Sequence, residues 1–224
     1  GGAIYVKGDD TNISTSTFEG NRAQTYGGAI YINGLDTDIL DSNFTNCSLS
    51  DAGSKGSAIY INGANTIING SDFKNCSIDA SGAQGGAIYI EGVNATIDDS
   101  TFENCKVNQI TGLGGAIYIK GNNATISKSM FNDSSAYRGG FIYLEGSWCN
   151  VSSSSFSNSY VSWDGGAMYS TGSYSGVYNS NFTNNVAGYD GGALFWYGGK
   201  TSATSSKNNT IDGCIFINNT AYAP

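Results

Sequence analysis

The 224-residue sequence contains no histidine and only one proline, and charged residues make up just 12% of it. Without histidine, Ser-His-Asp and Cys-His nucleophiles and histidine-ligated metal ions are excluded. The low charge does not indicate disorder, because hydrophobic residues make up 39% of the chain and are regularly spaced. Glycine is abundant instead, at 32 residues.

Long apolar runs and excess positive charge are also missing. No run approaches the roughly 18 apolar residues of a membrane-spanning helix, so we expect no direct membrane span in this segment. The net charge of −8 argues against nucleic acid and anionic membrane surfaces as partners.

Glycine marks an internal repeat of eight units with spacings of 25–29 residues. A phenylalanine follows the first glycine by 17 residues in seven units and by 25 in the eighth, which predicts an eight-residue insertion within 199–209. The units begin at Gly1, Gly27, Gly56, Gly85, Gly114, Gly139, Gly165 and Gly191, and their phenylalanines are Phe18, Phe44, Phe73, Phe102, Phe131, Phe156, Phe182 and Phe216.

Each unit alternates inward apolar residues with other residues, as in Ile88, Tyr89 and Ile90. A period of two is typical of a β-strand. Short strands at this spacing predict an all-β fold, a right-handed parallel β-helix of about eight turns in which equivalent residues stack. We expect residues 1–224 to form a single β-helix domain. Because both ends fall inside the repeat pattern, we expect this domain to be a fragment of a longer array.

The aromatic residues predict a candidate interaction surface. The tyrosines between the inward apolar residues have outward parity, which predicts an exposed stripe that includes Tyr89, Tyr118, Tyr143 and Tyr169. A second stack, two residues before the Gly-Gly pairs, consists of Tyr137, Trp163 and Tyr189. Contiguous exposed aromatic rings are typical of a surface that binds protein or glycan. The alternative is a ladder that stiffens the sheet without any ligand.

Two short motifs in each unit resemble a known repeat. "GGAIY" occurs at Gly1, Gly27, Gly85 and Gly114, and "FEGN", "FTNN" and "FINN" begin at Phe18, Phe182 and Phe216. The pair resembles the GGA[ILV]/FxxN repeats of chlamydial polymorphic outer-membrane proteins, and the style is similar to that of adhesin-like proteins of methanogenic archaea. The resemblance covers the whole chain and implies a secreted, surface-displayed protein used in adhesion. It implies no catalytic residues.

Cysteines and asparagines also follow the repeat. Cys47, Cys76 and Cys105 occupy the same place in consecutive units, and we interpret all five cysteines as buried free thiols. Asn-x-Ser/Thr sequons predict a glycoprotein, although asparagine is also a common corner residue. The candidate N-glycosylation sites are Asn12, Asn94, Asn123, Asn150 and Asn208.

The acidic residues are scattered, which argues against a catalytic carboxylate pair or a calcium site. We therefore expect a non-enzyme with no metal and no cofactor. The leading hypothesis is an extracellular, cell-surface adhesin or stalk segment whose partner is a host or neighbouring cell-surface protein or glycan. One alternative is a self-assembling component of a surface filament or wall layer. Another is a polysaccharide-active β-helix enzyme that uses Asp164 or Asp190.

Overall fold

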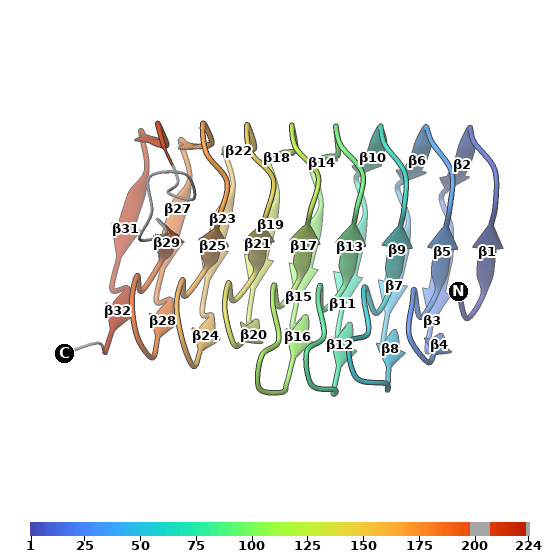
Figure 1. Cartoon of the computed structure of the whole chain (residues 1–224), viewed down its shortest axis with the longest axis horizontal. Coiled ribbons are helices and arrows are strands. Elements are labelled where there is room, and N and C mark those ends of the chain that lie inside the picture. Colours follow the sequence, from blue (N-terminus) through green and yellow to red (C-terminus); the bar gives the residue numbers. More distant parts are fainter. Residues whose placement is uncertain (198–206, 223–224) are drawn as a thin grey trace.

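A computed structural model describes residues 1–197 and 207–222. Within these residues the chain winds into a rod of eight turns, and every turn contributes one short strand to each of four eight-stranded sheets (Figure 1). All strand pairs within the sheets are parallel, which confirms the predicted all-β parallel β-helix. Residues 199–206 of the predicted insertion lie outside the described residues.

The first two sheets follow each other along every turn. The strands of the first sheet are β1 (Ile4–Val6), β5 (Ile30–Ile32), β9 (Ile59–Ile61), β13 (Ile88–Ile90), β17 (Ile117–Ile119), β21 (Ile142–Leu144), β25 (Met168–Ser170) and β29 (Leu194–Trp196). Those of the second sheet are β2 (Thr11–Ser14), β6 (Thr37–Leu40), β10 (Thr66–Asn69), β14 (Thr96–Asp98), β18 (Thr125–Ser127), β22 (Asn150–Ser152), β26 (Gly176–Tyr178) and β30 (Thr210–Asp212).

The third and fourth sheets complete the turn. The third consists of β3 (Thr17–Glu19), β7 (Asn43–Thr45), β11 (Asp72–Lys74), β15 (Thr101–Glu103), β19 (Met130–Asn132), β23 (Ser155–Ser157), β27 (Asn181–Thr183) and β31 (Ile215–Ile217). The fourth consists of the two-residue strands β4 (Arg22–Ala23), β8 (Ser48–Leu49), β12 (Ser77–Ile78), β16 (Lys106–Val107), β20 (Ser135–Ala136), β24 (Tyr160–Val161), β28 (Val186–Ala187) and β32 (Thr220–Ala221).

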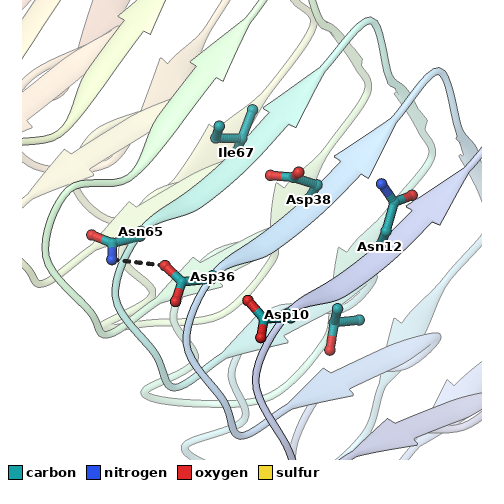
Figure 2. Close-up of a pocket in the computed structure, with 7 residues that line it drawn as sticks. Asp10, Asn12, Asp36, Asp38, Asn65 and Ile67 are labelled. Atoms are coloured by element: carbon teal, nitrogen blue, oxygen red, sulfur yellow. Dashed lines mark hydrogen bonds between the residues drawn. The ribbon is translucent and has the colours of Figure 1, made fainter.

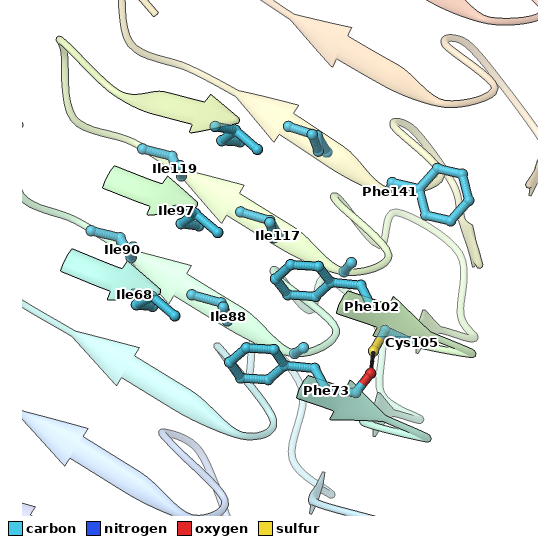
Figure 3. Packing of buried hydrophobic residues seen from close by; sticks show 14 of the residues in the cluster. Ile68, Phe73, Ile88, Ile90, Ile97, Phe102, Cys105, Ile117, Ile119 and Phe141 are labelled. Carbon is cyan, nitrogen blue, oxygen red and sulfur yellow. Dashed lines mark hydrogen bonds between the residues drawn. The ribbon is translucent and has the colours of Figure 1, made fainter. Parts of the chain in front are cut away.

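The core is built by stacking like residues on like. Ile88 pairs in register with Ile117, and Phe73 with Phe102, whose rings stack 4.8 Å apart. Figure 3 shows these isoleucine and phenylalanine columns side by side in the interior. Because each fully buried side chain of this size contributes about 1.5–3 kcal/mol, the stacked columns stabilise turns that could not bury their apolar faces alone.

The corners between sheets require left-handed backbone. Eight non-glycine residues at the corner before the second sheet have φ between 52° and 60°. Asparagine and aspartate tolerate this conformation better than other side chains, because their short polar groups bond to the local backbone. The residues of this corner column are Asp10, Asp36, Asn65, Asn94, Asn123, Trp148, Tyr174 and Asn208.

The Gly-Gly pairs turn the chain sharply into the first sheet. Gly85 has a φ of +69°, and a Cβ atom placed on it would lie 2.1 Å from the carbonyl oxygen of Ile88. Only glycine fits a backbone that is both left-handed and this crowded. The residues before this turn pair with one another along the outside of the first sheet, from Tyr26 to Arg138.

The described part of the chain holds no helix with the length and apolar character to cross a membrane. In residues 1–197 and 207–222, no three His, Cys, Asp or Glu side chains converge as the ligands of a metal ion would.

Candidate functional site

The tyrosine column of the first sheet is buried from Tyr60 to Tyr169, and only Tyr5 at its beginning is exposed, so the prediction that these tyrosines form an exposed stripe is wrong. Its outward parity is correct, because the tyrosines form a cluster separate from the isoleucine core. The residues that we expected to be exposed are 1–9% accessible: Tyr89, Tyr118, Tyr143 and Tyr169. Their rings stack face to face with centroids 4.9–5.1 Å apart, so most of each ring is covered by its neighbours.

The edges of this tyrosine ladder are covered by the residues that precede the Gly-Gly pairs. These residues form bridges from turn to turn along the outside of the first sheet, from Tyr26 through Lys55 to Arg138. The Lys55 ammonium lies 4.5 Å from the centre of the Tyr89 ring, and the Arg138 guanidinium carbon lies 5.3 Å from that of Tyr169. A cation over an aromatic face is attracted by the ring quadrupole. The ladder is therefore a second, outer core.

The phenol groups of the ladder are tied to carboxylates. The hydroxyl of Tyr60 donates to Glu91 at 2.9 Å, and that of Tyr118 donates to Glu145 at 2.7 Å. Burial raises the pKa of both phenols, and the carboxylate hydrogen bonds raise it further. The hydrogen bond from Lys120 lowers the pKa of Glu91. This geometry supports the stiffening ladder that the sequence left open as an alternative.

The second predicted stack lies on the surface. Trp163 stacks on Tyr137 at 5.7 Å and on Tyr189 at 4.5 Å between ring centroids. Tyr189 is exposed, and the other two rings are half-buried. The turn-to-turn stacking of these three residues is confirmed. We call them the loop ladder.

A further aromatic stack, a pair of residues, was not predicted from the sequence. Trp148 and Tyr174 stack at 5.5 Å with nearly parallel rings, and each is about half exposed. Both have a φ of 56° in the corner column where the other six turns carry asparagine or aspartate. The signal was present in the sequence as two bulky residues in an Asn/Asp column. We call this pair the corner pair.

The loop ladder and the corner pair flank the first sheet on the same turns. Trp148 follows β21 and Tyr174 follows β25, whereas Tyr137 precedes β21 and Trp163 precedes β25. At the loop-ladder position the preceding turns carry Thr25, Ser54, Ala83 and Gly112. Exposed aromatic side chains thus replace small or polar ones at both corners of the same part of the rod.

An acidic pocket of about 380 Å³ lies on the first three turns. Figure 2 shows Asp10, Asp36 and Asp38 around it, with Asn65 donating to Asp36 at 2.8 Å. Asp10 and Asp36 come from successive corners, and Asp38 lies in β6 of the second sheet. Their spacing along the rod agrees with the scattered acids of the sequence.

The two acids that the enzyme alternative used lie next to each other. Asp164 is buried, and its carboxylate lies 3.4 Å from Nε of Arg138 and accepts the backbone N–H of Asp190 at 3.2 Å. Burial raises the pKa of Asp164. These contacts describe a carboxylate that orients Arg138 over the tyrosine ladder.

All five candidate N-glycosylation sites are exposed. Asn12 and Asn150 lie in β2 and β22, and Asn94 and Asn123 lie in the corner column. Nδ2 of Asn94 donates to Asn65 at 2.9 Å, so a glycan on this nitrogen would replace one amide hydrogen. Glycosylation stays a prediction.

The five cysteines are free, and all except Cys214 are buried. The thiols of Cys76 and Cys105 donate to the carbonyls of Phe44 and Phe73 at 3.6 and 3.5 Å, and Figure 3 shows the second contact. Burial raises the pKa of the Cys149 thiol. The interpretation of these residues as buried free thiols is confirmed for four of the five.

Comparison with known proteins agrees with this geometry. Residues 86–223, more than half of the chain, match the family described as the right handed beta helix region. Residues 15–33 match the Chlamydia polymorphic membrane protein repeat, and this stretch contains the "FEGN" and "GGAIY" motifs. The second match indicates a likeness to a family of surface proteins. No curated protein and no solved structure matches the chain.

Proposed function

The chain belongs to the family of right-handed β-helix regions, and from this premise we propose that it is an adhesin or stalk segment displayed on the outside of a cell. The rod is the rigid support, and its aromatic corners attach to a protein or glycan of another surface. The likeness to a membrane-protein repeat supports display at the surface. Exposed sequons support a glycoprotein.

One observation carries the proposal. Five aromatic rings, each exposed or half-buried, stack at two corners of neighbouring turns, at positions that other turns fill with small or polar residues. Trp148 and Tyr174 also hold a left-handed backbone that costs about 1–2 kcal/mol for most side chains. Local strain that the fold does not need is typical of functional positions.

We further propose that the chain has no catalytic activity of its own. The absence of histidine supports this proposal, as does the engagement of Asp164 with Arg138 and the Asp190 backbone. Incubation with neutral and acidic polysaccharides should release no reducing ends. Turnover that is lost in Asp164→Asn would support the enzyme alternative instead.

Attachment can be tested with the protein immobilised on beads and a panel of microbial and animal cells. Wild-type beads should bind at least one cell type. A variant with Trp148→Asn, Tyr174→Asn, Trp163→Ser and Tyr189→Ser should lose this binding, because it removes four of the five rings of the corner pair and the loop ladder and leaves the isoleucine core and the tyrosine ladder intact. Circular dichroism checks that the variant is folded.

The matched control removes equally exposed tyrosines from the two ends of the rod. Tyr5→Ser with Tyr222→Ser should bind cells like the wild type. Equal attachment by the four-residue variant, or no attachment of the wild type to any surface, would overturn the proposal. Concentration-dependent fibres without attachment would favour the filament alternative.

A further inference from the structure

Three consecutive turns carry longer loops than the rest of the rod. The segments that lead from β8 to β9, from β12 to β13 and from β16 to β17 extend beyond the later loops, which Figure 1 shows at its lower edge. The loop after β20 is shorter. The change creates a step along the rod, and a concavity of about 310 Å³ lies there.

The aromatic loop ladder ends at this step. The backbone N–H of Tyr137 donates to Gly112 at 2.9 Å, so Gly112 holds the equivalent place in the preceding turn. Trp163 covers one face of the Tyr137 ring. Because Gly112 has no side chain, the ladder does not continue on the other side, and Tyr137 lines the concavity.

Gly112 is closely packed against the Val107 side chain, which any larger residue here would displace. A Cβ atom there would lie 2.3 Å from Cγ1 of Val107. The Arg138 guanidinium carbon lies 5.3 Å from the centre of the Tyr137 ring, and Nε of the same guanidinium lies 3.4 Å from the Asp164 carboxylate. The ring is thus fixed by Trp163 and Arg138 before any ligand binds.

The long loop whose residues Asn108, Gln109 and Ile110 line the concavity is held by a side-chain hydrogen bond and contains a strained residue. The side-chain amide of Gln109 donates to Asp79 at 2.7 Å, which fixes the last long loop to the loop before it. Thr111 has a φ of +70°, whereas the two earlier loops place Gly53 and Gly82 at the equivalent turn. A β-branched residue in this conformation is a genuine outlier. Strain of this kind clusters at ligand sites.

The lining is uncharged, although the chain has 28 charged residues (10 basic and 18 acidic). It combines two tyrosine rings with amide and hydroxyl groups, and Tyr160 in the floor is 57% exposed. Rings offer flat apolar contact, and amides and hydroxyls exchange hydrogen bonds with a ligand. A small concave site that mixes these groups is typical of a ligand pocket.

We propose that this step, bounded by Asn108, Gln109, Ile110, Ser135, Tyr137 and Tyr160, binds an uncharged saccharide. A sugar ring has apolar C–H faces for the parts of Tyr137 and Tyr160 that line the concavity and hydroxyls for the amides, and it brings no charge that the neutral lining would have to desolvate. The proposal rests on the proposed attachment function and names its ligand class. A segment of a longer glycan fits, because the concavity is open to solvent.

Calorimetric titration with soluble glucan, mannan and galactan oligosaccharides tests the site, with oligogalacturonate as the acidic counterpart. At least one neutral saccharide should bind saturably. Tyr160→Ser should weaken this binding at least about tenfold, because it removes one of the two rings. Ser162→Arg, which adds bulk and charge at the rim without touching the aromatic stack, should do the same.

Tyr222→Ser is the matched control, since it removes an equally exposed tyrosine far from the step, and its affinity should equal that of the wild type. No binding of any neutral saccharide, equal binding by Tyr160→Ser and Ser162→Arg, or a preference for the acidic oligosaccharide would overturn the proposal. Cells that still attach to beads carrying Tyr160→Ser would then show that attachment stands without this site. If wild-type beads attach to no cell, the attachment function fails independently of the titration.

Discussion

At the scale of single residues, backbone conformation decides which side chains the corners accept. Glycine, asparagine and aspartate occupy most left-handed positions, and the six exceptions in the described part of the chain are Thr15, Thr111, Lys128, Trp148, Ser153 and Tyr174. The corner pair Trp148 and Tyr174 and the strained Thr111 all lie beside exposed aromatic or concave surface. The unfavourable left-handed backbone of these three residues therefore occurs next to the proposed binding surfaces.

Gly82 and Gly85 lie in the same loop and are alike in conformation, since both have left-handed backbone, but only Gly85 is also closely packed. Substituting each by alanine therefore distinguishes the cost of the backbone conformation from the cost of the close contact. Gly82→Ala should destabilise the protein by about 1–2 kcal/mol, because it only forces a side chain into a left-handed backbone. Gly85→Ala should cost about 1–3 kcal/mol more, because its Cβ would also overlap the Ile88 carbonyl oxygen. Chemical denaturation measures both. Equal losses would contradict the argument for the tight turn.

Relief of strain at the corner pair should stabilise the rod. Replacement of both Trp148 and Tyr174 by asparagine removes two unfavourable left-handed residues and one ring stack, for a net gain of about 1 kcal/mol in the free energy of unfolding. Thermal melts check the sign. Lower stability of this variant would mean that the pair is structural, and would weaken the attachment proposal.

At the scale of elements, the first sheet separates two cores. Its isoleucines face the interior, and its tyrosines form the outer ladder beneath the residues that precede the Gly-Gly pairs. The same strand is therefore buried on both faces. This explains why three-residue strands suffice here, since every side chain in β13 and β17 is buried.

The buried tyrosines predict a loss of stability in alkali. Burial raises the pKa of Tyr169 to about 12 from the usual 10.0, and burial also raises the pKa of Tyr89. The unfolded chain loses these protons near its pKa of 10.0, whereas the folded chain keeps them until about 12. Stability is therefore complete below pH 10.0 and falls as the pH rises toward about 12.

Tyrosinate absorbance and circular dichroism should change together over this range. A variant with Tyr89→Phe and Tyr169→Phe, which cannot ionise at these positions, should unfold at a higher pH than the wild type. Ionisation of Tyr89 and Tyr169 near their ordinary pKa with the fold intact, seen as the absorbance difference between the wild type and this variant, would contradict a buried ladder.

At the scale of the whole molecule, the rod is a one-dimensional stack in which each turn contacts its neighbours. Such stacks open first where a turn has a neighbour on one side only. Four of the free thiols are buried along the rod, and Cys214 in the last described turn is half-buried. The cysteines therefore report opening at different points along the axis.

In moderate urea, a protein of these 224 residues should react with an alkylating reagent first at Cys214 and last at Cys76 and Cys105. The central thiols become accessible only when interior turns open. Mass spectrometry of partly modified protein gives the order. Simultaneous reaction of all five thiols would show that the rod unfolds as a single cooperative unit.

The sequence by itself determined the fold, because each turn of a solenoid corresponds to one repeat of the sequence. The spacing of Gly85 from Gly114 and of Phe73 from Phe102 set the turn length, and the alternation in Ile88, Tyr89 and Ile90 set the faces. The stacking of Tyr137, Trp163 and Tyr189 also followed from the repeat register.

Only the tertiary structure decided which outward side chains reach solvent. The alternation of the strand places Tyr89 outside the core. Its burial depends on the path of the chain before the strand, because this segment places residues such as Lys55 over the tyrosine rings. The step beside Tyr137 likewise arises where a long loop meets a short one across turns. Periodicity fixes the direction of a side chain, whereas its exposure depends on segments that only packing brings together.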